Sequence, residues 1–130
     1  MVFDRPTAFE LLDSVSVFLE EKIKGELPKH LAFNVQIAIN VINIVKREIE
    51  NGKEINESSK KLIADILQQG NSTESLSKAI KDGKMDLDNK ELQKVLLEIT
   101  KMKLSVDNPN YSTYKDLVEW IDRFFISKYT

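Results

Sequence analysis

The chain has 130 residues, with 19 Lys and Arg against 21 Asp and Glu, a formal net charge of -2 at pH 7. This length predicts one domain. Its 42% hydrophobic content, with 4 Gly and 3 Pro, excludes a disordered chain and disfavours an all-β fold. The balanced charge gives no overall attraction to nucleic acid or anionic lipid. We expect an all-α single-domain bundle with no nucleic-acid partner.

The sequence has no cysteine, which excludes disulfides, thiolate zinc sites and iron–sulfur clusters. No segment approaches the roughly 18 uninterrupted apolar residues of a membrane helix. The first ten residues carry Asp4, Arg5 and Glu10, where a signal peptide is apolar. We therefore expect a cytoplasmic protein with no membrane segment.

Apolar residues recur at spacings of three and four in six stretches, which predicts six amphipathic helices. The expected helix starts carry capping patterns at Thr7, Asn71 and Asp88, and Gly25 and Gly83 follow two expected ends. The predicted helices run from Thr7 to Gly25, Pro28 to Glu50, Glu57 to Gln69, Asn71 to Gly83, Asp88 to Met102 and Ser112 to Lys128.

The second predicted helix is the longest and is expected to end at Asn51 and Gly52. Between Val35 and Val45 it is apolar almost all round, which is typical of a helix covered on several sides. This β-branched run could also form a buried strand. We favour a helix because the run is long, lacks glycine and continues into charged residues. It is predicted to be the central apolar helix of the bundle.

A polar stripe crosses this apolar helix. Gln36, Asn40, Asn43 and Arg47 are spaced four, three and four residues apart, so they share one helical face. If buried, each amide needs a hydrogen-bond partner. One interpretation of the stripe is structural: an internal network, joined by Asp107 or Asn108, or a groove exposed to water. The other is functional: the polar wall of a ligand groove or a docking face for a partner, with Arg47 available to hold a carboxylate or phosphate.

Two features near the end of the chain are candidates for partner contact. Asp107, Asn108 and Pro109 predict a turn that leads to Tyr111. In the last predicted helix, Trp120 lies at the edge of the apolar face, where it either completes the core or anchors an interface.

No motif for catalysis or metal binding stands out. His30 is the single histidine and has no cysteine to complete a zinc site. The acidic stretch from Asp82 to Asp88 does not fit a calcium loop, because the position that requires glycine is Glu91 and the position that requires a bidentate glutamate is Leu97. We expect no metal, no cofactor and no catalytic residues.

Three stretches resemble a family of small helical prokaryotic proteins known as a domain of unknown function. They are residues 4–12, residues 31–48, and residues 86–88 together with 103–112. The last stretch, Lys103 to Ser112, is the most specific because helix amphipathicity does not dictate a polar loop. The chain departs from the family at Asn34, Gln36 and Asn110, where the family commonly has charged residues or histidine.

The resemblance implies a genomic context rather than an activity. Members are often encoded beside phosphotransferase-like enzymes and acyl-CoA dehydrogenases, which implies an accessory role in the catabolism of hydroxy acids or their acyl-CoA forms. The leading hypothesis is thus a non-enzymatic accessory or protein-interaction domain that binds such a partner enzyme. The alternative is a small-molecule-binding protein or enzyme with a groove lined by Asn40, Asn43, Arg47 and Asp107. Homodimerisation through an apolar helix face is also open.

Overall fold

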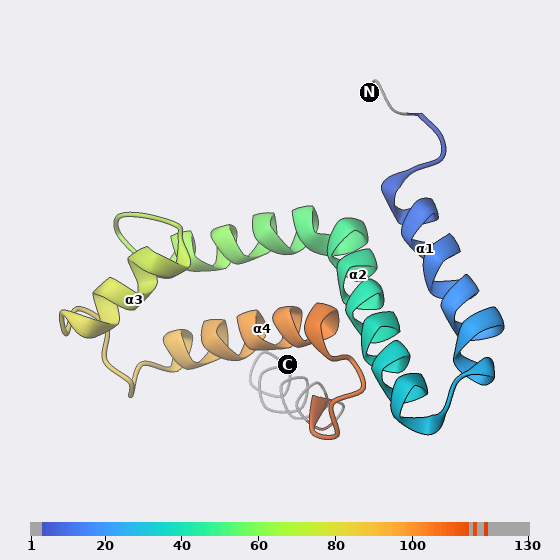
Figure 1. Cartoon of the computed structure of the whole chain (residues 1–130). Coiled ribbons are helices and arrows are strands. Elements are labelled where there is room, and N and C mark those ends of the chain that lie inside the picture. Colours follow the sequence, from blue (N-terminus) through green and yellow to red (C-terminus); the bar gives the residue numbers. More distant parts are fainter. Residues whose placement is uncertain (1–3, 115, 117–118, 120–130) are drawn as a thin grey trace. The chain divides into compact units, whose positions relative to one another are not determined.

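A computed structural model describes residues 4–114, 116 and 119 of the chain. Within these residues the secondary structure is helical, without strands, and it comprises four α-helices (Figure 1). A π-helical segment, Leu19–Ile23, and a 3-10 turn, Lys24–Glu26, connect the first two helices. The all-α class is confirmed for this part of the chain. The helices are α1 (Ala8–Phe18), α2 (Lys29–Ile66), α3 (Thr73–Lys81) and α4 (Lys90–Asp107).

The predicted number of helices is wrong for the described residues, because the second and third predicted helices form one long helix, α2. Asn51 lies inside it, and its Nδ2 donates to the Arg47 carbonyl one turn earlier at 3.3 Å. Gly52 is also helical, and its φ is not positive. A glycine inside a helix costs only about 1 kcal/mol relative to alanine. The sixth predicted helix lies almost wholly outside the described residues.

The chain divides into two compact units, Met1–Gly52 and Lys53–Thr130, with the boundary inside α2. We call them unit 1 and unit 2 and describe each by itself. None of the helices among the described residues combines the length and the apolar character needed to cross a membrane.

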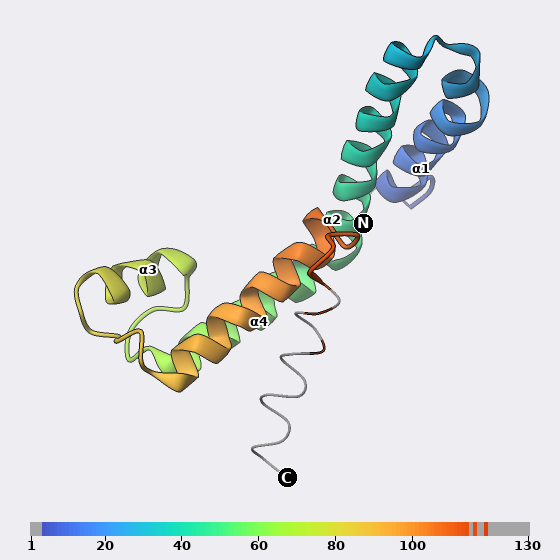
Figure 2. The same ribbon diagram turned by 90° about the horizontal axis from the view of Figure 1, so that it is seen from below.

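Unit 1 is a helical hairpin in which α1 runs beside the first part of α2, as Figures 1 and 2 both show. The predicted capping box is half formed. Thr7 Oγ1 accepts a hydrogen bond from the Glu10 amide at 3.1 Å, as expected. The Glu10 carboxylate instead pairs with Arg5, with Nη2 and Oε2 3.1 Å apart. The Arg5 guanidinium therefore binds the Glu10 carboxylate, which the capping-box pattern predicts to accept from a backbone amide at the start of α1.

The hairpin has few buried side chains. Among its described residues, only Ile39 and Ser16 are buried, at 4% and 7% exposure. Within the described residues of unit 1, the predicted cover on several sides of α2 is not formed, although α2 is the long central helix that was expected. α1 covers one side of α2, and the side chains of Phe33 and Val41 on another side are 65% and 53% exposed. The apolar run of the sequence makes a surface here instead of a core.

Unit 2 has a conventional small core. The last turns of α2 pack with α3 and α4, and Figure 2 shows α4 running beside this part of α2. The most buried side chains are Ile63, Leu76, Leu92 and Val95, all at most 5% exposed. Partly buried side chains surround them: Leu62, Ile66, Leu67, Ile80, Met85 and Ile99. Unit 2 therefore packs against its own helices.

The predicted helix caps in unit 2 are one residue too early. Ser72, not Asn71, caps α3, and its Oγ accepts from the Ser75 amide at 3.1 Å. Asn89, not Asp88, caps α4, since its Oδ1 accepts from the amides of Glu91 and Leu92. α4 also continues past Met102 to Asp107, through residues predicted to be a connection. Adjacent polar residues offer equivalent caps, so the sequence pattern alone does not choose between them.

Gly52, inside α2, and Gly70, in the turn after α2, test this description. A Cβ at position 52 would lie 3.5 Å from the Glu48 side chain, an ordinary contact. We expect Gly52→Ala to raise the free energy of unfolding by about 0.5 to 1 kcal/mol, because alanine loses less backbone entropy in a helix. Urea unfolding followed by circular dichroism measures this change, and a destabilised variant would contradict a continuous helix at Gly52.

Gly70→Ala is the matched comparison and should behave in the opposite way. Gly70 has a φ of +89°, and a Cβ there would lie 2.5 Å from Ser75 Oγ. Backbone strain alone should cost about 1 to 3 kcal/mol. A Gly70→Ala variant as stable as the wild type would show that the turn before α3 is wrongly described.

Candidate functional site

The polar stripe of α2 forms hydrogen bonds within the hairpin. Lys24 Nζ, from the connecting segment, donates to Gln36 Oε1 at 2.8 Å, and Gln36 Nε2 donates to Asn40 Oδ1 at 3.0 Å. Lys24 also forms an ion pair with Glu20, with Nζ and Oε1 2.5 Å apart. The first half of the stripe therefore ties the connecting segment to α2.

The second half of the stripe reaches α1. The buried Ser16 hydroxyl donates to Asn43 Oδ1 at 3.3 Å. One turn further along α2, Lys46 pairs with Asp13 and lies 5.1 Å from the centre of the Phe9 ring. Polar groups thus fix the contact between α1 and α2, and in the described residues no buried side-chain nitrogen or oxygen lacks a partner.

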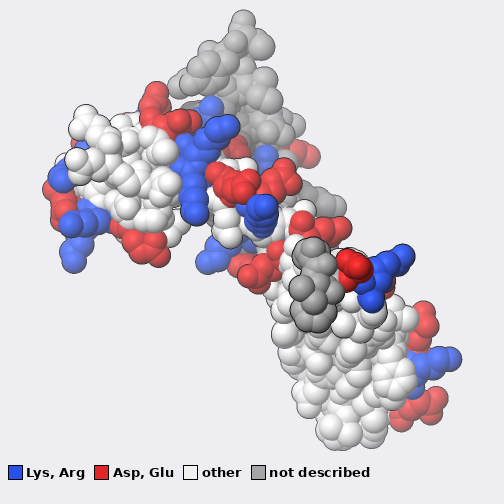
Figure 3. Space-filling view, turned by 90° about the horizontal axis from the view of Figure 1, so that it is seen from above, with Lys and Arg blue, Asp and Glu red and all other residues white. Residues whose placement is uncertain are grey.

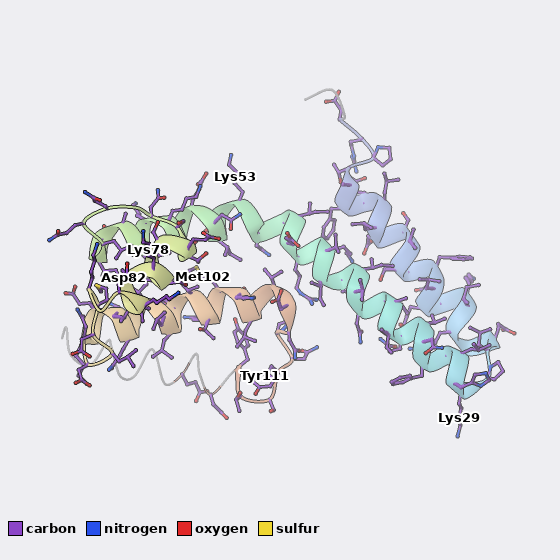
Figure 4. All side chains as sticks on the ribbon, turned by 60° about the vertical axis from the view of Figure 1, so that its left-hand side comes forward. Lys29, Lys53, Lys78, Asp82, Met102 and Tyr111 are labelled. Atoms are coloured by element: carbon purple, nitrogen blue, oxygen red, sulfur yellow. The ribbon has the colours of Figure 1, made fainter. Side chains whose placement is uncertain are left out.

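The predicted turn after α4 lies in unit 2, whereas the polar stripe lies in unit 1. The Asn108 amide donates to the Leu104 carbonyl at 2.9 Å, and the Tyr111 amide donates to the Asn108 carbonyl at 3.0 Å. Asp107 is exposed and Tyr111 is 48% exposed (Figure 4). The turn therefore presents a polar edge and one aromatic ring. Trp120, the remaining predicted contact residue, lies outside the described residues.

The ionisable groups of the described residues form no metal site: no cluster of three or more His, Asp or Glu is placed to hold an ion. His30 is exposed in the first turn of α2. In the acidic stretch, the Asp88 amide donates to Asp86 Oδ1 at 3.3 Å, which makes a local turn. At the start of α3, a hydrogen bond from its own backbone amide lowers the pKa of the exposed Glu74, and the Thr73 hydroxyl adds to this.

Unit 2 also has a surface pocket of about 760 Å³. The end of α2, the following loop and α3 line it, and Figure 4 marks two of its residues, Lys78 and Asp82. These two side chains and that of Lys84 are exposed to solvent. Charges in such a setting are well solvated, so the pocket lacks the desolvated polar groups of a built ligand site.

The most unusual surface in the described residues belongs to the hairpin, and we call it the hairpin surface. It consists of large apolar side chains that are each 38% to 65% exposed. On α2 they recur every four residues, and because each step of four drifts about 40° beyond a full turn, they wind around the helix from Phe33 to Ile49. Its members are Leu11, Val15 and Phe18 on α1, and Phe33, Ile37, Val41, Val45 and Ile49 on α2.

Charged side chains are scarce around the hairpin surface. No residue from His30 to Val45 is Asp, Glu, Lys or Arg. Figure 3 shows a broad face of the hairpin with almost no red or blue, and with charged groups gathered along one edge. Apolar patches larger than a few hundred Å² are rare on monomers and usually mark interaction sites.

The sequence reading missed the hairpin surface because it assigned the same residues to the core. The signal was nevertheless present. A helix that is apolar all round needs neighbours on every side. The side chains of Gln36, Asn40 and Asn43 form their hydrogen bonds on one side of α2 only, toward α1 and its connecting segment. The remaining apolar sides have no neighbour of matching length in unit 1.

Comparison with known families places these observations in context. A family model, the domain of unknown function DUF6285, matches residues 25–111. The match includes the whole of α2, α3 and α4 and leaves α1 outside. The chain therefore belongs to this family, which confirms the resemblance inferred from its sequence. No curated protein and no solved structure matches the chain.

The polar contact between α1 and α2 gives a second prediction. Asn43→Ala leaves the buried Ser16 hydroxyl without an acceptor and should lower the free energy of unfolding by about 1 kcal/mol. A double-mutant cycle with Ser16→Ala should give a coupling energy of about 0.5 to 1.5 kcal/mol, measured by urea unfolding.

Asn40→Ala is the control for this cycle. Asn40 lies on the same stripe but is exposed, so its replacement should change stability by less than about 0.5 kcal/mol. A coupling energy near zero between positions 16 and 43 would contradict the packing of α1 on α2.

Proposed function

We propose that this chain is a non-enzymatic accessory protein that acts by binding other protein chains, and that the hairpin surface is where it binds. The observation that carries the proposal is the set of half-exposed apolar side chains on α1 and α2. Water contact at such side chains is unfavourable by roughly 25 cal/mol per Å², so covering them drives association.

The chemistry of the surface favours a protein as the bound molecule. An amphipathic helix that lies on a lipid surface carries Lys and Arg along its polar face, whereas the polar side of α2 carries amides that bond to α1 and its connecting segment. Nucleic acid requires a basic patch, and the segment from His30 to Val45 has no Lys or Arg. Exposed apolar side chains along a helix instead suit packing against other helices.

The accessory role extends the proposal to specific enzymes. The resemblance implies a phosphotransferase-like enzyme or an acyl-CoA dehydrogenase as partner, and a cytoplasmic location fits the cysteine-free sequence. For these enzymes the turn from Asp107 to Tyr111 is a second contact, because it offers a carboxylate and a half-exposed aromatic ring. Aromatic rings of this kind often anchor interfaces.

Native mass spectrometry of the chain isolated gently from its own cells tests the proposed function. The wild type should appear in a complex with at least one further protein chain. In Phe33→Glu/Val41→Glu, two carboxylates replace exposed apolar groups of the hairpin surface, and the complex should be lost because desolvating a charge opposes association.

Asn51→Glu/Asn56→Glu is the matched control. It adds the same charge to exposed positions of α2 outside the hairpin surface, so the complex should persist. Circular dichroism verifies that all three proteins keep their helices. A surface variant that retains the complex, or a wild type found only as a bare monomer, would overturn the proposed function.

A further inference from the structure

Helix α2 belongs to both units, because the boundary between them falls at Gly52 inside the helix. Before this point α2 bonds to α1, and after it the last turns of α2 pack in the core of unit 2. Between these contacts, none of residues 48–57 is buried and most are exposed. We call residues 48–57 the link. Local stability is low where a segment has few buried contacts and its backbone hydrogen bonds face water.

The composition of the link is unfavourable for a helix. Glycine is, after proline, the least favourable residue in a helix interior, because it has the most backbone freedom to lose. Asn51 and Asn56, on either side of Gly52, also have low helix propensity. Glu50 and Glu54 are four residues apart, so two like charges lie on one face of the helix and repel each other. The link therefore has less to keep it helical than the packed ends of α2.

Two side chains bond to backbone carbonyls of α2 on either side of Gly52. Asn51 Nδ2 donates to the Arg47 carbonyl at 3.3 Å, and Ser59 Oγ donates to the Asn56 carbonyl at 3.0 Å. Both carbonyls are also acceptors for the backbone amides of the next turn. Side chains that compete in this way often bend helices, and kinks occur where a side chain inserts into the backbone hydrogen-bond ladder.

We propose that α2 is hinged at Asn51 and Gly52, where the helix opens locally and unit 1 turns relative to unit 2. Hinges lie at a few residues that absorb a change in φ and ψ, and glycine does so at the lowest steric cost. Among the described atoms, a Cβ built at Gly52 meets only the Glu48 side chain, in the preceding turn of α2. No described neighbour therefore obstructs a change in the backbone on this side.

The hinge is independent of the proposed function, because it rests on the residues of α2 alone. It adds a property to the binding of other protein chains. A partner that contacts both the hairpin surface and the turn from Asp107 to Tyr111 then needs no fixed arrangement of the two units.

Amide hydrogen exchange of the purified full-length chain tests the local opening. Amides of residues 52–57 should exchange faster than those of residues 60–66, in the packed end of the same helix. Gly52→Ala should slow exchange of residues 52–57 by about fivefold, the factor that corresponds to a helix preference of about 1 kcal/mol for alanine over glycine. Equal protection of the two segments in the wild type, or a variant that exchanges like the wild type, would overturn the hinge.

Gly25→Ala is the matched control for this variant. It adds the same methyl group outside α2, at a position where no described atom lies within 4 Å. Exchange of residues 52–57 should therefore equal that of the wild type. A Gly25→Ala variant that slows the link as much as Gly52→Ala does would overturn the hinge, because the effect would not depend on Gly52.

Distances between spin labels test whether the opening moves the units. The chain has no cysteine of its own, so labels can be attached at chosen exposed positions. Asn34→Cys/Lys103→Cys spans the two units, and Lys81→Cys/Lys103→Cys lies within unit 2. In double electron–electron resonance, the first pair should give a broad distance distribution that narrows in Gly52→Ala. The second pair should give a narrow distribution in both backgrounds. A first pair as narrow as the second in the wild type would overturn the hinge.

Discussion

Helix α2 carries more apolar surface than α1 covers. This mismatch governs unit 1: Ile39 is buried, while Phe33, Ile37 and Val41 on other sides of the same helix stay in contact with water. Apolar surface on this scale is unfavourable in an isolated hairpin. The proposed binding of another protein chain rests on this mismatch.

The polar residues of α2 decide which side is covered by α1 and which is left open. Asn43 accepts from the Ser16 hydroxyl, and Lys46 pairs with Asp13, so α1 docks on the side with hydrogen-bonding groups. A hydrogen bond specifies geometry while adding only about 1 kcal/mol of net stability. The polar stripe, which the sequence left open as an internal network or the wall of a ligand groove, takes part in this docking through Asn43.

Periodicity and caps predicted the helical class, the long α2 and the approximate positions of α3 and α4. They did not predict that α2 passes through Asn51 and Gly52, because a helix tolerates one interior glycine at a cost of about 1 kcal/mol. Nor could they predict the hairpin surface. Apolar spacing shows that a face of Ile, Val and Phe will be covered, but it does not show whether the cover belongs to the same chain.

The most direct measurement of the central claim is amide hydrogen exchange of the complex isolated from its own cells, compared with that of the purified chain. If another protein chain covers the hairpin surface, protection of residues 30–49 should be higher in the complex, because association suppresses local opening of α2. Protection of α4, which packs in the core of unit 2, should stay constant in the same samples. Protection of residues 30–49 that is the same in the complex and in the purified chain would contradict the account.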